Sequence, residues 1–150
     1  MIDAHEGRAV HTFDIPGAYL HTSFPDDKVV HMKCECEFVE IMCKVDPEYG
    51  IFVIYEKKKN VLYVLILKAI YGIIYSALIW YDLFSTTLSY FGIKLNPCER
   101  CIANKVIDEH QFTMGLFVDN KKVSHMDEND NSMIDDMIEE KFGKLSRIIG

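Results

Sequence analysis

Two aspartates far apart in the chain stand at the ends of apolar, strand-like segments. Asp14 closes the alternating segment 10–15, and Asp119 follows the apolar segment 112–118. If these two segments are neighbours in one sheet, both carboxylates emerge at the same edge, where oxygen ligands can share hard cations such as Mg²⁺. Two such ions activate an attacking oxygen and stabilise a leaving one. A purely structural role is the alternative, because acids at strand ends and Asp-Asn turns are also common without a metal.

The elements that position these acids are predicted from hydrophobic periodicity. The pattern favours a helix over 76–91, ended by Gly92, and a second amphipathic helix that ends near Gly143. The second helix has its apolar face at Met133, Ile134, Met137, Ile138 and Phe142, with acids opposite. Strands are predicted over 10–15, 29–34, 101–107 and 112–118, with 123–126 pairing back across an Asp119-Asn120 turn, and a hairpin joins 51–55 to 61–67.

These elements predict the fold class α+β, an antiparallel sheet with helices packed on one face. The segment 38–45 fits either a helix or a strand, and 46–50 is predicted to be a loop. A length of 150 residues favours one domain. Trp80, Tyr81, Phe84 and Phe91 recur at helical spacing, which favours core packing over base stacking.

Charge and cysteine usage restrict the class of protein. The net charge is −7, and the segment 127–141 carries −6 of it, with seven acids and one lysine, which argues against a small basic nucleic-acid module. Five cysteines and no secretory signal predict an intracellular protein, cytoplasmic or nuclear and not secreted, with reduced thiols. The segment 61–81 is long enough for a membrane span, but Lys68 near its middle favours two separate elements and no membrane partner.

Three further features have ordinary explanations. Cys98 and Cys101 have zinc-knuckle spacing without a second pair of ligands, so structural or incidental thiols are expected. The six histidines show no close metal-ligand spacing and are expected to face solvent or fill strands. The run of lysines at 57–59 is expected to be a solvated hairpin tip, with contact to a phosphate backbone as the alternative.

Three motifs in order resemble a known family. The segment 11–20 (HTFDIPGAYL) resembles motif A of Ty1/copia-type reverse transcriptases, 67–81 resembles their L-Y-G-L-K-Q-S segment with its helix, and 117–120 (FVDN) stands where they carry Y-V-D-D. The resemblance covers nearly the whole chain. It implies a partial reverse transcriptase domain from a retrotransposon polyprotein, with the palm and part of the fingers of a right-hand polymerase fold. Thumb, connection and ribonuclease H are expected to be absent.

The resemblance also implies a role for each matching residue. Asp14, Asp119 and Asn120 would be catalytic, and Asp14, Asp119 and the Ile15 carbonyl would hold two Mg²⁺ or Mn²⁺ ions. The substrates would be an RNA or DNA primer-template and deoxynucleoside triphosphates. Tyr19 would be the steric gate against a ribose 2′-hydroxyl. The nucleotide-binding residues would be Tyr19, Tyr71, Gly72, Ser76 and Val118.

The sequence departs from this family at several positions. Asn120 replaces the second aspartate of Y-V-D-D, so the site loses one carboxylate. Ile74 and Tyr75 stand in place of Lys-Gln, and Ala77 replaces a common proline. These departures predict little or no polymerase activity. Two alternatives remain open: a non-catalytic remnant that at most binds nucleic acid or a partner chain, and a chain too incomplete to fold stably.

Overall fold

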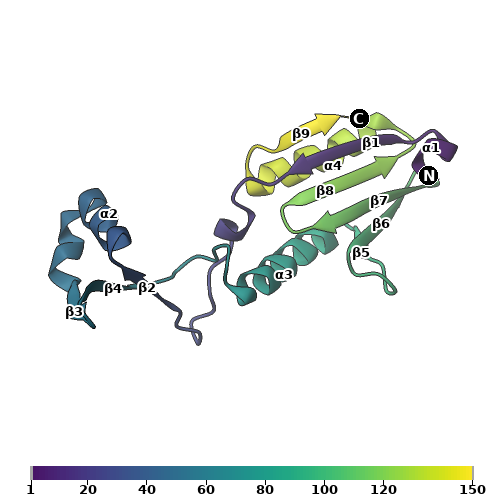
Figure 1. The fold of residues 1–150 in the computed structure, drawn as a ribbon. Coiled ribbons are helices and arrows are strands. Elements are labelled where there is room, and N and C mark those ends of the chain that lie inside the picture. The colour runs from purple at the N-terminus through teal and green to yellow at the C-terminus, as the bar shows by residue number, and fades with distance from the viewer. Residues whose placement is uncertain (1, 150) are drawn as a thin grey trace. The chain divides into compact units, whose positions relative to one another are not determined.

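The computed structural model describes residues 2–149 and divides the chain into two units (Figure 1). The main unit combines residues up to 22 with residues from 69 onward, and the inserted unit spans residues 23–68. The length predicted one domain, whereas the inserted unit has a sheet and a small core of its own.

The main unit is built on a six-stranded antiparallel sheet in the order β5-β6-β7-β8-β1-β9. This arrangement confirms the predicted class of mixed helix and antiparallel sheet. The long β7–β8 hairpin lies beside the first strand, so the sheet joins segments from both ends of the chain (Figure 1). Its strands are β1 (Ala9–Asp14), β5 (Lys94–Leu95), β6 (Ile102–Ile107), β7 (His110–Phe117), β8 (Asn120–His125) and β9 (Ser146–Ile149).

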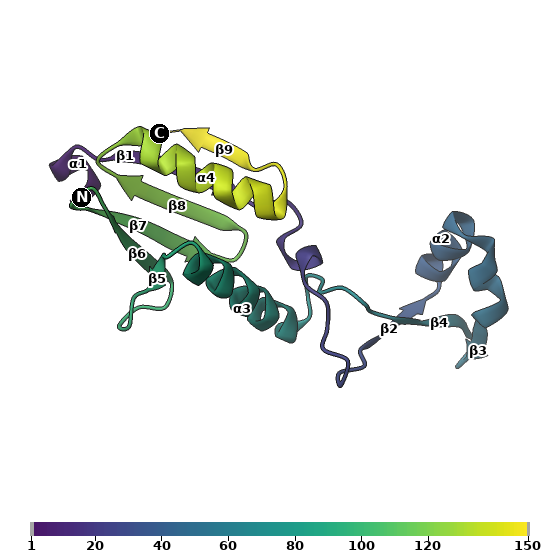
Figure 2. The ribbon, with the colours of Figure 1, turned by 180° about the vertical axis from the view of Figure 1, so that it is seen from behind.

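Two long helices of the main unit, α3 (Ile74–Tyr90) and α4 (Glu128–Phe142), cover the same face of this sheet (Figure 2). They meet where Phe142 packs against Trp80 and Phe84, with ring centroids 5.3 and 5.7 Å apart. The strands contribute Phe13, Phe112, Met114 and Val123 to the core between the helices and the sheet, and all four are almost fully buried. The short helices α1 (Ile2–Glu6) and η1 (Ala18–His21) flank β1.

The end of α3 follows the prediction from Gly92. Gly92 has a φ of 74°, and the amide of Ile93 donates to the Leu88 carbonyl at 2.9 Å. A left-handed glycine with this pairing is the usual way to satisfy the last carbonyls of a helix. The beginning differs, because the helix starts at Ile74, after a turn at Tyr71-Gly72, rather than at Ser76.

The buried face of α4 differs from the predicted apolar face. Ile134, Ile138 and Phe142 are buried as expected, but Met133 is half exposed and Asp135 and Asn131 are fully buried. The helix turns these two polar groups inward because β1 offers partners: Asn131 donates to the Ala9 carbonyl at 2.9 Å, and Asp135 meets His11 at 3.3 Å. The acids of α4 are therefore not confined to its outer side.

Burial raises the pKa of Asp135 above its ordinary value, although His11 and Arg147 act in the opposite direction. When folding raises the pKa of a carboxyl group, the folded protein loses stability as the pH rises from the pKa of that group in the unfolded chain to its higher pKa in the folded protein. We expect Asp135→Asn to match the parent near pH 3 and to gain stability relative to the parent as the pH rises toward 7. Chemical denaturation across this range measures the difference.

The matched control for this variant is Asp136→Asn, because Asp136 is the exposed neighbour on the same helix. It is expected to show no gain that grows with pH. A constant difference between Asp135→Asn and the parent at all pH values would contradict the assignment of a buried carboxyl.

The inserted unit is a three-stranded sheet, in the order β2-β4-β3, that packs against one helix. The segment 38–45, compatible with helix or strand, is helical, and the predicted loop 46–50 is largely a 3₁₀ helix. The turn of the predicted hairpin is only Lys57-Lys58, both at positive φ, and Lys59 pairs with Glu35 at 2.9 Å. Its elements are β2 (His31–Glu35), α2 (Glu37–Val45), η2 (Pro47–Phe52), β3 (Ile54–Glu56) and β4 (Lys59–Leu65).

The apolar run 61–81 is divided between β4, a connecting segment and the first half of α3. Within residues 2–149, none of the helices combines the length and the apolar character that crossing a bilayer requires. All five cysteines are free thiols, and Cys98 and Cys101 are exposed.

Candidate functional site

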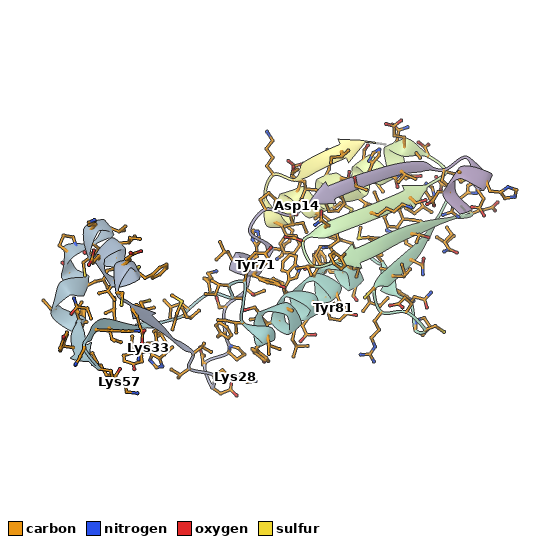
Figure 3. All side chains as sticks on the ribbon, viewed as in Figure 1. Asp14, Lys28, Lys33, Lys57, Tyr71 and Tyr81 are labelled. Atoms are coloured by element: carbon orange, nitrogen blue, oxygen red, sulfur yellow. The ribbon has the colours of Figure 1, made fainter. Side chains whose placement is uncertain are left out.

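The two aspartates singled out from the sequence meet at one edge of the main sheet, the edge formed where the neighbouring inner strands β1 and β8 end and begin. Asp14 is the last residue of β1 and is paired in register with Asn120, the first residue of β8. The amide of Ile15 donates to the carbonyl of Asp119 at 3.0 Å. Both carboxylates also raise the pKa of the same phenol, that of Tyr71. The sheet therefore brings Asp14 and Asp119 together, and Figure 3 shows Asp14 and Tyr71 at this end of the main unit.

The turn that presents Asp119 is not the predicted Asp119-Asn120 turn. Phe117 pairs directly with Asn120, so Val118 and Asp119 are the two turn residues. Val118 adopts a φ of 50°, which is unusual for a β-branched residue. Its carbonyl accepts hydrogen bonds from Trp80 Nε1 at 2.7 Å and from Lys121 Nζ at 2.6 Å. These two buried donors hold the strained turn in place.

The Asp119 carboxylate is held from two sides. The Tyr71 hydroxyl donates to its Oδ2 at 2.5 Å, and the Asn120 amide donates to its Oδ1 at 3.2 Å. Partial burial alone would raise the pKa of Asp119, but the Tyr71 hydrogen bond, backbone hydrogen bonds and the charge of Lys121 outweigh it and lower the pKa. The carboxyl is therefore ionised at neutral pH.

Tyr71 shows the reciprocal effect. Three effects raise the pKa of Tyr71 to about 12. The largest is its hydrogen bond to Asp119, and burial and nearby negative charge add to it. Its ring also lies against Tyr19, with centroids 4.4 Å apart. Tyr71 is thus a neutral donor that fixes the orientation of Asp119.

Removing the Tyr71 hydroxyl tests this coupling. We expect Tyr71→Phe to raise the pKa of Asp119, because burial remains while the leading favourable hydrogen bond is lost. Carboxyl carbon chemical shifts followed through an acid titration measure the change. Tyr90→Phe is the control, since Tyr90 is exposed on α3, and an unchanged Asp119 titration in Tyr71→Phe would contradict the coupling.

Lys121 belongs to this site and was not singled out from the sequence. Its side chain is only 3% exposed, and its ammonium lies 4.5 Å from the Phe84 ring centroid. Burial lowers the pKa of Lys121 to about 8, partly offset by the charges of Asp119 and Asp14. The neighbouring Lys122 is exposed, and only the register of β8 distinguishes the two. The site therefore combines two carboxylates with one buried cation.

The remaining predicted residues lie around this edge in different settings. Ile15 is buried, and its carbonyl accepts from the Ala18 amide at 3.2 Å, which leaves one lone pair. Tyr19 is also buried, with 7% of its surface exposed. Gly72 has a φ of 92° and open space where a Cβ would stand, so its backbone conformation itself favours glycine. Ser76 is fully buried, and its hydroxyl accepts from the Ile70 amide at 3.2 Å, which fixes the segment carrying Tyr71.

The donors at this edge fit a hard divalent cation. Carboxylate and amide oxygens are the ligands that Mg²⁺ and Mn²⁺ favour, and the carboxylate of Asp14, whose backbone is paired in the sheet, forms no hydrogen bond or ion pair with the described residues. Across residues 2–149, His, Cys, Asp and Glu side chains form no group of three or more placed to hold a metal. A metal site here would therefore depend on Asp14, Asp119 and neutral oxygens such as that of Asn120.

Comparison of this chain with protein-family models, with curated proteins and with solved structures finds no match.

Proposed function

We propose that the chain is the palm, with part of the fingers, of a Ty1/copia-type reverse transcriptase, and that it performs RNA-directed DNA synthesis weakly. The observation that carries the proposal is the pairing of Asp14 with Asn120, which sets Asp119 beside the end of β1. The motif order supports it, because the residues that resemble motif A and Y-V-D-D are those that the sheet brings together. An antiparallel sheet with helices on one face is the architecture that a palm requires.

Within this proposal, Asp14 and Asp119 hold the divalent ions, with the Ile15 carbonyl and the Asn120 amide as neutral ligands. Such ions, when bound, activate a primer 3′-hydroxyl and neutralise the triphosphate. The lowered pKa of Asp119 keeps its charge available at neutral pH. Tyr71 holds that carboxylate through its hydroxyl, 2.5 Å from Oδ2. Trp80 and Lys121 fix the turn, because both side chains donate hydrogen bonds to the Val118 carbonyl.

The nucleotide would lie near the segment from Tyr71 to Ser76. Gly72 leaves open space there, and the buried Ser76 positions Tyr71 rather than facing a ligand. The Tyr19 ring packs against the Tyr71 ring. Its role as a sugar gate rests on the family resemblance.

Primer extension on a defined RNA template tests the proposal. The parent chain is incubated with Mn²⁺ or Mg²⁺ and deoxynucleoside triphosphates, and single-nucleotide incorporation is measured beside Asp14→Asn. We expect slow incorporation by the parent and none by the variant. Incorporation that persists in Asp14→Asn would contradict the proposed metal site.

One observation favours a second function, that of a non-catalytic binding remnant. Asn120 carries no charge, and its amide group already donates to Asp119. On this alternative, the parent binds primer-template in a gel-shift titration but shows no incorporation with either metal. Cooperative thermal unfolding of the main unit in the same samples would separate this outcome from a chain that does not fold.

A further inference from the structure

A pocket of about 190 Å³ lies between α3 and the β7–β8 hairpin, below the Val118-Asp119 turn. Half of its lining residues are aromatic. Ala77 of α3, which is exposed to solvent, also lines the pocket. Trp80 and Phe84 are almost fully buried, whereas Phe117 is 75% exposed, so the pocket is walled on one side and reaches solvent on the other. Its aromatic residues are Tyr19, Trp80, Tyr81, Phe84 and Phe117.

Lys121 supplies the charged group of this otherwise apolar lining. Its ammonium donates to the Val118 carbonyl at 2.6 Å and, more weakly, to the Asn120 carbonyl at 3.4 Å. An ammonium has three N–H bonds. Among residues 2–149 the Lys121 ammonium has no third acceptor, and its nitrogen lies over the Phe84 ring, 4.5 Å from the centroid. The pocket thus offers one hydrogen-bond donor in an aromatic setting.

We propose that this pocket binds a neutral, planar heteroaromatic ring whose acceptor nitrogen accepts a hydrogen bond from Lys121. Flat aromatic walls select a planar ring. A cavity of about 150 Å³ accommodates benzene, so the larger volume here fits a bicyclic ring. Asp14 and Asp119 already lie in the field of Lys121, which disfavours an anionic ligand. The proposal is independent of polymerase function.

The single tryptophan of the chain provides a direct readout. Trp80 lines the pocket, and its indole N–H donates to the same Val118 carbonyl as Lys121. Its indole cross-peak in a ¹H–¹⁵N correlation spectrum therefore reports both occupancy of the pocket and any change at the turn. Quinoline is the probe, and naphthalene is its matched control, because the two rings have the same shape and only quinoline carries an acceptor.

We expect quinoline to shift the Trp80 indole peak saturably at millimolar concentration or below, and to bind about tenfold more tightly than naphthalene. Lys121→Met keeps an unbranched apolar side chain, one atom shorter than lysine, and removes the donor, so it should abolish this preference. An unshifted Trp80 peak, or equal affinity of the parent for the two rings, would overturn the proposal.

A second pair of variants tests the location of the site. Ala77→Leu adds three carbons at the pocket lining and is expected to weaken quinoline binding at least tenfold. Leu78→Ala, an exposed change on the same helix outside the pocket lining, should leave binding unchanged. Both residues are exposed on α3, so the fold is retained, as circular dichroism verifies. Equal quinoline affinity in Ala77→Leu and the parent would place binding elsewhere and overturn the proposal.

Discussion

Trp80→Ala is expected to lower the unfolding free energy of the main unit by about 3–5 kcal/mol, the usual cost of truncating a large buried aromatic residue. Trp80 is 2% exposed and packs against Phe84 and Phe142, so its loss opens a cavity where α3 meets α4. The variant also removes one of the two donors to the Val118 carbonyl. Denaturant unfolding followed by circular dichroism measures the loss, and amide exchange in β1 and β8 assigns it to the main unit.

Two controls separate the contributions in this experiment. Trp80→Phe keeps an aromatic ring and loses the hydrogen bond, so a smaller cost of about 1–2 kcal/mol is expected. Tyr90→Ala removes an aromatic ring of α3 that is 88% exposed, and its expected cost is near zero. A Trp80→Ala cost no larger than that of Tyr90→Ala would show that the helices are not joined to the sheet through this residue.

Asn120→Asp is expected to tighten the binding of Mn²⁺ by about tenfold or more. The added carboxylate stands opposite Asp14 in the register and next to Asp119, and affinity at oxygen sites rises with the number of ligand charges. Isothermal titration calorimetry measures the affinity. In primer extension, the same variant is expected to incorporate nucleotides faster than the parent, because the site regains the carboxylate that Asn120 lacks.

Without metal, the same variant is expected to be less stable than the parent near neutral pH. Three carboxylates at one edge repel one another, which raises their pKa values in the folded protein, so stability is lost as the pH rises through their titration range. Asn129→Asp adds the same charge at the exposed start of α4 and serves as the control. Equal Mn²⁺ affinities for Asn120→Asp and Asn129→Asp would contradict a metal site at this edge.

The sequence was sufficient to predict the strand that ends at Asp14 and the strand that precedes the turn with Asp119, because both segments are apolar and bounded by turn residues. The end of α3 was also predictable, since Gly92 at positive φ is a strong local signal. Features that depend on register were not predictable. Lys121 and Lys122 are adjacent and identical, and only the pairing of β8 with β1 decides which one is buried.

The turn and the last helix show the same limit. A valine at positive φ contradicts local preference, and Val118 adopts it because buried donors from Trp80 and Lys121 reach its carbonyl. The face of α4 was predicted from apolar periodicity, which cannot anticipate that His11 would draw Asp135 into the interior. In each case, a contact between distant segments overrides the local signal.

The chain leaves and re-enters the main unit at almost the same point. The amide of Ala69 donates to the Thr22 carbonyl at 3.1 Å, so the two ends of the excursion are hydrogen-bonded neighbours. A short linker that joins these two residues directly would spare every strand of the six-stranded sheet and all of its long helices. Residues 23–68 therefore form an insertion whose removal would leave every strand pairing of the carboxylate-bearing sheet in place.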